Sequence, residues 1–365
     1  MPEKGKVAVA MSGGVDSSVA AAVLKEAGYR VFGITMLIYA SGNGQLEKDK
    51  RETRPTDYAA EDARKVCSQL GIEHHVLDLS EDFQKHVIDY FICEYEQGRT
   101  PNPCVVCNRH IKFERLMNAA FSLGADYLAT GHYARIIYSS HKKQYFLQKG
   151  RDTGKDQTYF LYNLTQEKLA QCIFPLGGYL KEEVRQMARD FNLAVREKPE
   201  SQEICFIEDN DYKGFLKSKG KAACSPGPFL STSGERIGTH QGIPFYTVGQ
   251  RKGLGLAVGY PVYVTDIDPT RNAVVVGKRE ELFAPGLLAG EVNTISGEPL
   301  EEQELLVKIR YRSPEVEAVL TPVSRRRVSI RFNTPQRAVT PGQAVVFYKG
   351  DLVLGGGIIE ERIEK

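Results

Sequence analysis

Residues 12–18 read Ser12-Gly13-Gly14-Val15-Asp16-Ser17-Ser18 and lie between two apolar segments. The stretch Val7 to Met11 has the length and composition of a buried parallel strand, and the apolar residues from Val19 to Leu24 predict a helix that ends at Gly28. A strand, a glycine turn and a helix in this order direct backbone N–H groups at an anion. Because the turn contains serine hydroxyls but no lysine, it differs from the Walker A loop that holds a γ-phosphate.

The segment resembles the PP-loop of the N-type ATP pyrophosphatases, SGG-x-DS. In that family ATP is cut between its α- and β-phosphates, and a substrate oxygen is adenylated. An acidic residue at a phosphate site is expected to meet Mg²⁺ rather than phosphate, so Asp16 is the candidate magnesium contact. The resemblance implies that the ATP phosphates are cradled by Ala10, Met11, Ser12, Gly13, Gly14, Val15, Asp16 and Ser17.

The length and composition describe a multidomain protein without an evident membrane segment. At 365 residues the chain can form two or three domains with full cores, and its net charge of +2 neither indicates nor excludes a local RNA-binding patch. No apolar run approaches the roughly 18 residues that span a bilayer. Residues 1–6 lack the apolar core of a signal peptide, so we expect a cytoplasmic protein. Its seven cysteines are then expected to be thiols, catalytic groups or metal ligands.

Strands and helices alternate through the first half of the chain. This alternation predicts an α/β fold with a doubly wound, Rossmann-like parallel sheet, whose ligands bind at the carboxyl ends of the strands. Residues 41–55 are polar and are expected to leave the sheet as an excursion. Beyond the first strand and helix, the pattern predicts strands at 31–36, 75–79 and 127–130 and helices at 57–70, 83–98, 113–121 and 181–191.

From about residue 210 the composition changes to glycine, proline and short β-rich runs. We therefore predict a PP-loop catalytic domain over residues 1–208, a small β-rich domain over 209–282 and a C-terminal antiparallel β-barrel over 283–365. The strands predicted in this part lie at 262–267, 273–276, 305–309, 316–320, 328–332 and 344–347.

A second motif, TPNPCVVCN, occupies residues 100–108 and contains two thiols at CxxC spacing. A helix that begins near Asn108 would lower the pKa of the Cys107 thiol and make it a better nucleophile. A third cysteine, Cys205, lies far downstream in the stretch ICFI. Three thiols are too few for an ordinary structural zinc site, but they could hold an iron–sulfur cluster with one open iron. Thiol chemistry and a cluster therefore both stay open.

The complete set of motifs closely resembles the MnmA-type tRNA 2-thiouridylases. The resemblance extends from about Val7 to Glu360 and is carried by SGGVDSS, TPNP-x-x-x-CN-x-x-IKF, ATGHYAR, KDQTYFLY, ICFI, GQRKGLG and TPGQ-x-VFY. Members of this family use ATP to adenylate O2 of the wobble uridine at tRNA position 34. They replace that oxygen with sulfur from a cysteine persulfide, and the products are 2-thiouridine, AMP and pyrophosphate.

The resemblance also implies roles for individual residues. Met36 would lie against the adenine and Gly131 would line the nucleotide pocket. Cys107 stands at the nucleophile position, and Cys205 at the position that carries a persulfide received from a sulfur-relay protein or a cysteine desulfurase. The target base would be contacted by Asn102, Pro103 and Cys104, and the tRNA by His132, Lys155, Asp156, Gln157, Arg310, Tyr311 and Gln343.

One position departs from the family pattern. Many members carry Asp where this chain has Cys104, and the acid can there act in proton transfer or orientation. Either another group does this work beside a plain persulfide route, or Cys104, Cys107 and Cys205 serve a variant that depends on an iron–sulfur cluster. Two other classes compete with thiolation. A PP-loop ligase for a small metabolite would need neither the thiols nor a barrel, and a non-catalytic RNA-binding module leaves the phosphate loop unexplained.

The remaining candidates have structural interpretations. Cys67 and Cys93 lie on apolar helix faces and are expected to pack in the core, whereas Cys172 and Cys224 belong to no motif. The pair His74-His75 is expected to be structural. The run at residues 325–327 is expected to be a solvated basic face.

Overall fold

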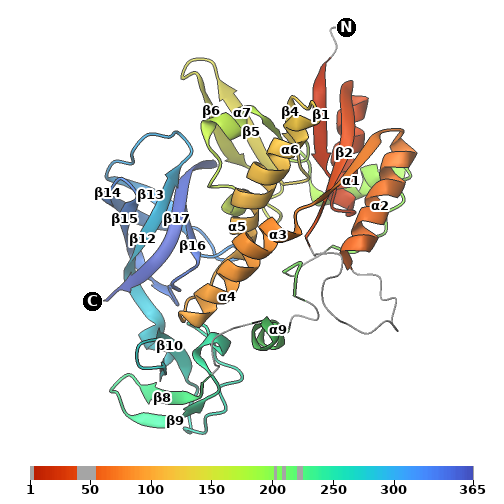
Figure 1. Ribbon diagram of the computed structural model, residues 1–365. Coiled ribbons are helices and arrows are strands. Elements are labelled where there is room, and N and C mark those ends of the chain that lie inside the picture. The colour runs from red at the N-terminus through yellow and green to blue at the C-terminus, as the bar shows by residue number, and fades with distance from the viewer. Residues whose placement is uncertain (1–3, 39–54, 201–203, 208–210, 220–224, 365) are drawn as a thin grey trace, which may run out of the picture.

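The computed structural model describes residues 4–38, 55–200, 204–207, 211–219 and 225–364 (Figure 1). Its first layer is a parallel sheet of strands β1 (Lys4–Ala10), β2 (Tyr29–Leu37), β3 (Glu73–Asp78), β4 (Tyr127–Ala129) and β7 (Cys172–Ile173). The strand order is β3-β2-β1-β4-β7, so the order reverses between β1 and β4. Ligands of doubly wound sheets bind at such a switch point, beyond the carboxyl ends of the strands.

Both faces of the parallel sheet are covered, as its apolar strands require. Successive side chains of a strand point to opposite faces. In β1, Val7 and Val9 pack with helices α1 (Val15–Glu26) and α8 (Lys181–Asp190), whereas Ala8 packs with the helix run at residues 103–122. The predicted doubly wound α/β sheet is therefore confirmed. Helix α2 (Pro55–Leu70) lies on the α1 side; of the polar stretch 41–55, residues 41–54 lie outside the described residues.

Two long helical runs follow in the chain, and the second, at residues 103–122, packs on the other face of the sheet. The first joins α3 (Ser80–Phe83), the π-helical turn η1 (Gln84–Ile88) and α4 (Asp89–Glu96). The second joins α5 (Pro103–Val106), the π-helical stretch η2 (Cys107–Leu116) and α6 (Met117–Ser122). Short helical segments η3 (Thr158–Phe160) and α7 (Gln166–Ala170) follow. Within the described residues, no helix has both the length and the apolar composition that crossing a bilayer requires.

A small β-rich domain follows the catalytic sheet, as predicted. Its strands β8 (Gly227–Ser231), β9 (Arg236–His240), β10 (Tyr263–Asp268) and β11 (Ala273–Gly277) have the order β10-β11-β8-β9. The helical segments α9 (Tyr212–Lys219), η5 (Ile243–Phe245) and η6 (Arg279–Leu282) flank this sheet. Its buried Phe229 and Val264 share one apolar cluster with Phe83 and Phe91, so the sheet packs directly on the α3–α4 run.

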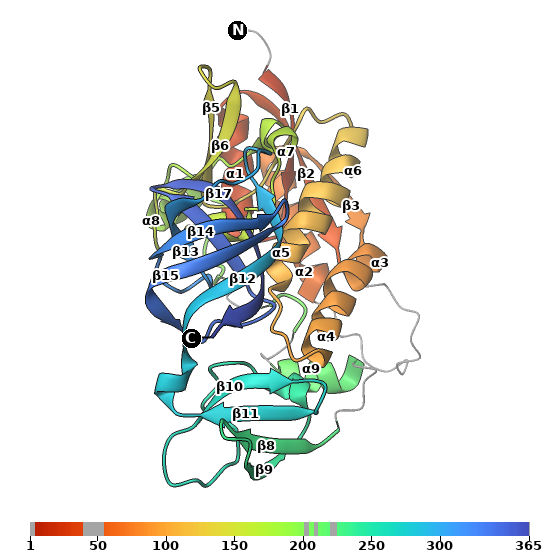
Figure 2. The ribbon, with the colours of Figure 1, turned by 90° about the vertical axis from the view of Figure 1, so that its left-hand side faces the viewer.

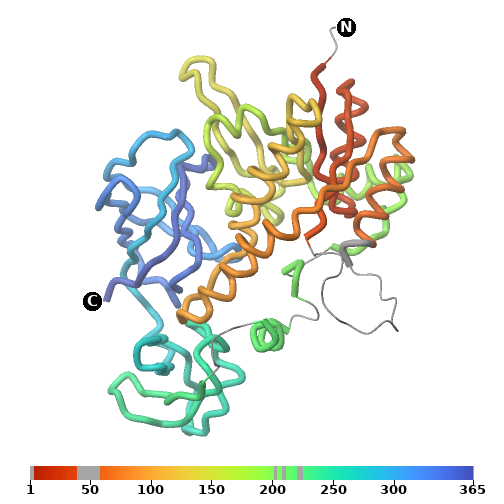
Figure 3. Tube along the Cα trace, in the orientation of Figure 1, coloured from red at the N-terminus to blue at the C-terminus, as the bar shows by residue number. Residues whose placement is uncertain are grey.

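The C-terminal region is a closed antiparallel barrel, which confirms the predicted architecture (Figure 2). Strands β12 (Phe283–Thr294) and β17 (Leu352–Ile363) pair and close a six-stranded ring. Figure 3 follows the chain from the red sheet through the green middle domain to this blue barrel. The other four strands of the ring are β13 (Gln303–Lys308), β14 (Val316–Ser324), β15 (Arg327–Arg337) and β16 (Ala344–Lys349).

A hairpin that the sequence pattern did not predict joins the catalytic region to the barrel. Its strands are β5 (Ala134–Ser139) and β6 (Gln144–Lys149), and β6 pairs with β17. The expected core position of Cys93 was wrong, because α4 turns its neighbours Ile92 and Tyr95 inward and leaves Cys93 exposed. Cys67 is buried as predicted. Cys224 lies outside the described residues.

Candidate functional site

The expected phosphate loop forms a tight turn between β1 and the N-terminus of α1. The hydroxyl of Ser17 accepts a hydrogen bond from the backbone N–H of Ser12 at 3.2 Å and donates to the carbonyl of Gly14 at 3.2 Å. Ser18 donates to the same carbonyl at 2.8 Å. Among the residues that the structure describes, no side chain caps α1, whose first residue follows Gly14. This geometry suits an anionic ligand.

The end of β4 lies directly against this loop. A Cβ atom at Gly131 would stand 2.9 Å from the backbone nitrogen of Ser17 and 3.0 Å from the carbonyl carbon of Asp16, so only glycine allows this approach. The half-buried Met36 lies at the end of β2, the strand beside β1. The residues expected to bind ATP thus gather at the carboxyl edge of neighbouring strands.

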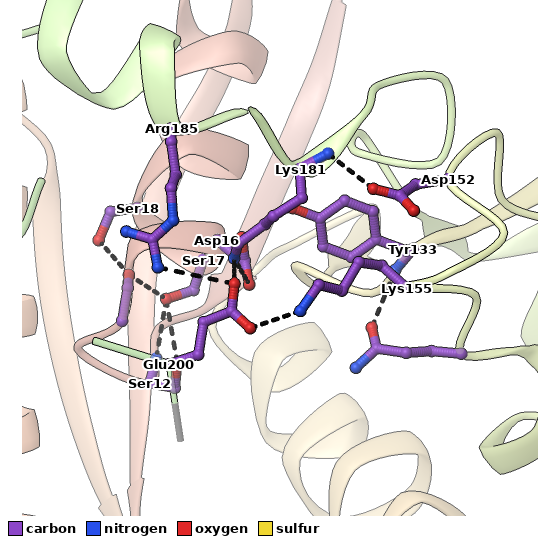
Figure 4. A network of polar contacts seen from close by, with 12 residues as sticks. Ser12, Asp16, Ser17, Ser18, Tyr133, Asp152, Lys155, Lys181, Arg185 and Glu200 are labelled. Atoms are coloured by element: carbon purple, nitrogen blue, oxygen red, sulfur yellow. Dashed lines mark hydrogen bonds and ion pairs between the residues drawn. The ribbon is translucent and has the colours of Figure 1, made fainter. Parts of the chain in front are cut away.

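The carboxylate of Asp16 is held by a lysine that the sequence did not single out. The ammonium group of Lys181, at the start of α8, donates to the two carboxylate oxygens of Asp16 at 2.6 and 2.8 Å (Figure 4). The hydroxyl of Tyr133 donates to Asp16 Oδ1 at 2.9 Å. Lys181 is only 8% exposed, and its backbone N–H is fixed by Asp152 at 2.9 Å. A cation is therefore fixed beside the phosphate loop.

A second acid, Glu200, gathers further cations near the same loop. Its carboxylate forms ion pairs with Lys155 at 2.6 Å, Lys181 at 3.1 Å and Arg185 at 3.6 Å. Burial would raise the pKa of Glu200, but the hydrogen bonds and charges of Lys181 and Lys155 outweigh burial and lower the pKa to about 2. Lys198 donates to the carbonyl of Gly13 at 3.0 Å. Together these basic side chains can attract a polyphosphate.

The cysteine helix begins earlier than the sequence pattern indicated. Asn102 is the N-cap and accepts a hydrogen bond from the backbone N–H of Val105 at 3.3 Å, while Pro103 occupies the first turn. Cys107 therefore lies within a continuous helical run and is 8% exposed. The prediction of a lowered pKa was wrong, because burial raises the pKa of the Cys107 thiol to about 11.

The fold brings Cys205 close to the cysteine helix across about a hundred residues of chain. Burial raises the pKa of Cys205 to about 12, and the nearby thiols of Cys107 and Cys104 raise it further. Cys104 and Cys205 have atoms exposed at the surface, although the protein around their thiols removes enough water to raise the thiol pKa values, whereas Cys107 as a whole is buried. Within the described ranges, no three His, Cys, Asp or Glu side chains are arranged to hold a single metal ion.

One cation, Lys112, acts on all three thiols. Its charge lowers the pKa values of Cys104, Cys107 and Cys205, in each case against the larger effect of burial. Lys112 lies on the π-helical stretch η2, in which residues five apart are joined by a hydrogen bond, so it stands one turn beyond Cys107. Lys112 belongs to the IKF motif, and the sequence alone predicted no role for it.

His132 connects the phosphate loop to the cysteine helix. It follows Gly131 at the end of β4, and its ring lies 6.0 Å from that of Phe113 on η2. Thr130 and the Nδ1 atom of His132 share a hydrogen bond of 2.7 Å. Burial and the charge of Lys112 hold the pKa of His132 well below its usual range, so the imidazole is neutral. Two adjacent residues after β4 thus face different parts of the site: Gly131 faces the phosphate loop, and His132 faces the cysteine helix.

The other expected tRNA contacts also bind within the chain. The Asp156 carboxylate is buried and accepts hydrogen bonds from Gly150 at 3.1 Å and from the Thr158 hydroxyl at 2.7 Å. Gln157 accepts a hydrogen bond from Tyr133 at 3.0 Å. The barrel residues among them contact their own barrel or the catalytic domain: Arg310 donates to Ala338 and Thr340, Tyr311 packs on Phe160, and Gln343 donates to Thr100 and Pro101.

Three family models together match most of the chain. Residues 5–209 match the model described as "tRNA methyl transferase HUP domain". Residues 213–278 match "tRNA methyl transferase PRC-barrel domain", and residues 285–359 match "Aminomethyltransferase beta-barrel domain".

Curated relatives match over almost their entire lengths. The chain is 52% identical over 361 residues to a tRNA-specific 2-thiouridylase MnmA of Carboxydothermus hydrogenoformans, and the match covers 98% of both chains. It is 53% identical to the protein of that name from Pelotomaculum thermopropionicum, again over 98% of both chains. A third relative, tRNA-specific 2-thiouridylase MnmA 1 of Caldanaerobacter subterraneus, is 51% identical over the full length of both chains.

Proposed function

The chain belongs to the family of tRNA-specific 2-thiouridylases, and on that premise we propose how its site carries out ATP-dependent thiolation of tRNA. It is a tRNA sulfurtransferase that converts uridine to 2-thiouridine with the consumption of ATP. We place the target at O2 of the wobble uridine, position 34. The observation that carries the proposal is the meeting of a phosphate loop and three thiols at one strand end, where Gly131 touches the loop and His132 faces the cysteine helix.

The first step of the proposed reaction is adenylation. The uridine O2 attacks the α-phosphorus of ATP, an O–P bond forms, and pyrophosphate leaves with the electron pair of the broken bond. Backbone N–H groups between Gly13 and Ser17 would bind the phosphates, together with the ammonium groups of Lys181 and Lys198, which lie at Asp16 and at the Gly13 carbonyl in the free protein. Mg²⁺, when bound with ATP, would neutralise phosphate charge, and Asp16 is the carboxylate that fits it. In the free protein the Lys181 ammonium group holds both oxygens of Asp16. We propose that, when ATP binds, this ammonium group moves to the phosphates that leave as pyrophosphate.

The second step transfers sulfur. The terminal sulfur of a Cys205 persulfide attacks C2 of the adenylated uridine. The Cys107 thiolate then attacks Sγ of Cys205, and the persulfide S–S bond breaks with its electron pair on the sulfur bound to C2. That sulfur forms the C=S bond as AMP leaves. Cys107 and Cys205 end as a disulfide, so a thiol reductant must act before the next turnover.

The raised pKa values of the thiols give Lys112 a role in this step. Only a thiolate is a good nucleophile, and burial keeps Cys107 protonated near neutral pH. Lys112 is the cation that favours the thiolate of Cys107 over the thiol. We propose that the Lys112 charge stabilises the Cys107 thiolate during this attack. The persulfide route then needs no metal cluster.

We also infer the sulfur donor and the compartment from the cysteines. The exposed position of Cys205 suits loading by a second protein, either a sulfur-relay protein or a cysteine desulfurase. All six described cysteines are free, which agrees with a reducing compartment such as the cytoplasm. Basic residues of the barrel are the proposed contacts for the tRNA phosphates.

Reconstitution with purified components tests this function. The protein, ATP, Mg²⁺, a persulfide donor and a tRNA with unmodified U34 should yield pyrophosphate, AMP and 2-thiouridine in equal amounts, measured by mass spectrometry of digested tRNA. Cys107→Ser and Cys205→Ser should abolish thiolation. Cys93→Ser is the matched control, since this thiol is exposed and belongs to no site. Release of pyrophosphate with a small metabolite but not with tRNA would favour the metabolite ligase instead.

A further inference from the structure

The barrel holds the loop that precedes the cysteine helix. The side-chain amide of Gln343 donates two hydrogen bonds, to the carbonyls of Thr100 at 2.8 Å and Pro101 at 3.2 Å. In the opposite direction, the backbone N–H of Thr100 donates to the carbonyl of Pro341 at 2.9 Å. Three hydrogen bonds therefore join residues 100–101 to the turn at 341–343, although more than 240 residues separate them.

The turn that makes these bonds is itself fixed. Gly342 has a φ of +90°, and a Cβ atom there would lie 2.8 Å from the backbone nitrogen of Thr100, so glycine is required for both reasons. The backbone N–H of Gly342 donates to the carbonyl of Ile359 at 2.9 Å, and Ile359 donates back to Gln343 at 2.8 Å. Because Ile359 belongs to β17, the turn is anchored in the closed barrel.

The middle domain contacts the same loop. The hydroxyl of Thr100 donates to the hydroxyl of Thr247 at 3.2 Å. Two residues earlier, the chain passes so close to β10 that a Cβ at Gly98 would stand 2.6 Å from Ile267. Residues 98–101 therefore lie where all three domains meet.

The loop in turn determines where the cysteine helix starts. Asn102 directly follows the clamped residues and caps α5 through Val105. A shift of the loop would move this cap, and Cys104 and Cys107 lie within the next five residues. The resemblance to the family implies that Gln343 contacts tRNA. An amide group has two N–H donors, and in the free protein both are used on the loop carbonyls.

We propose that Gln343 is a positioning residue that clamps residues 100–101 to the barrel and so sets the cysteine helix for sulfur transfer. The barrel thereby links binding of the tRNA to the placement of the thiols. This inference rests on the proposed thiolation, but the clamp is also visible in the free protein. Release of the loop should uncover Cys107, which is now 8% exposed.

The test compares Gln343→Glu, Gln343→Leu and the control Gln303→Glu. Gln343→Glu keeps the shape but turns an oxygen toward two carbonyls, and Gln343→Leu removes the donors without adding charge. Gln303 lies on the barrel strand β13, and its side-chain amide donates to the carbonyl of the nearby Glu301 at 3.3 Å. The first readout is the rate at which iodoacetamide alkylates Cys107 in the protein without tRNA, measured by peptide mass spectrometry. The second is the pair of constants kcat for thiolation and Kd for tRNA.

We expect both Gln343 variants to alkylate Cys107 about tenfold faster and to lose about tenfold in kcat, the factor that corresponds to the loss of one or two net hydrogen bonds. The Kd of Gln343→Leu for tRNA should stay within about twofold of wild type, since the N–H groups of Gln343 are engaged by the loop carbonyls. Gln303→Glu should match wild type in alkylation and kcat. Unchanged alkylation together with a weakened Kd would overturn the clamp and make Gln343 a direct tRNA contact. If the wild type fails to thiolate tRNA, the proposed function fails, while the alkylation rates still decide the clamp.

Discussion

Replacing Lys181 by methionine should separate stability from catalysis at the phosphate loop. The change removes an ammonium group that is 8% exposed and leaves Asp16 with the Tyr133 hydroxyl as its remaining donor. At the observed separation of 2.6 Å the gross attraction is about 6 kcal/mol for an effective dielectric constant of about 20. Desolvation of both groups offsets much of it, and Asp16 is one-third exposed, so we expect a net loss of about 2 kcal/mol.

The matched control is Arg185→Met in the same network. Arg185 reaches Glu200 at 3.6 Å and is more exposed than Lys181, so its loss should cost under about 1 kcal/mol. Unfolding in urea is best followed by circular dichroism, because the chain contains no tryptophan. Adding Asp16→Asn to Lys181→Met should recover most of the lost stability, since the unpaired carboxylate is then neutral.

Catalysis should not recover in the double variant. If Lys181 binds pyrophosphate, Lys181→Met should lower kcat/KM for pyrophosphate release by about 10- to 100-fold, the value of a hydrogen bond to a charged group. The double variant should be at least as slow. Wild-type pyrophosphate release by folded Lys181→Met protein would refute the assignment, and recovery of activity in the double variant would show that Lys181 only neutralises Asp16.

Three further predictions follow from the charges of the site. The pKa of Glu200 is lowered to about 2, so its ion pairs stabilise the fold above its unfolded pKa of about 4.3 and this stability is lost as the pH falls from there toward 2. Between these pH values, the free energy of unfolding of Glu200→Gln should therefore fall less than that of the wild type. Lys112→Met should shift the pH profile of Cys107 alkylation to higher pH while Lys112→Arg restores it, and equal profiles for all three proteins would exclude an electrostatic role. Lys155→Ala and Arg310→Ala should weaken tRNA binding and flatten its salt dependence, because the family resemblance places both residues at tRNA contacts. Both side chains also bind within the chain, so unchanged tRNA binding over a salt series would show that their role is structural.

The architecture could be predicted from local patterns. The apolar run of β1 followed by residues 12–18 is a strand and turn whose geometry depends mainly on its own residues, and the alternation of β-rich segments indicated the barrel. The hairpin β5–β6 was missed because its strands are half-polar. It is stabilised by pairing with β17, which is more than 200 residues away in the sequence.

The chemistry of the site was harder to predict because it depends on burial and on distant partners. The thiol of Cys107 was expected at a helix N-terminus, but the pair Asn102-Pro103 starts the helix earlier and the thiol is buried. Asn followed by Pro is an N-cap signal that could have placed this boundary. Lys181 follows no motif of the loop and meets Asp16 only in the folded chain, so no spacing rule could reveal it.

The most direct test of the account is a single turnover that follows one sulfur atom. Protein loaded with a ³⁴S persulfide on Cys205 is mixed with ATP, Mg²⁺ and tRNA in the absence of reductant, and protein and tRNA are then analysed by mass spectrometry. We expect one ³⁴S as 2-thiouridine at position 34 and one AMP for each Cys107–Cys205 disulfide formed. Labelled 2-thiouridine without that disulfide, or thiolation by Cys205→Ser protein, would contradict it.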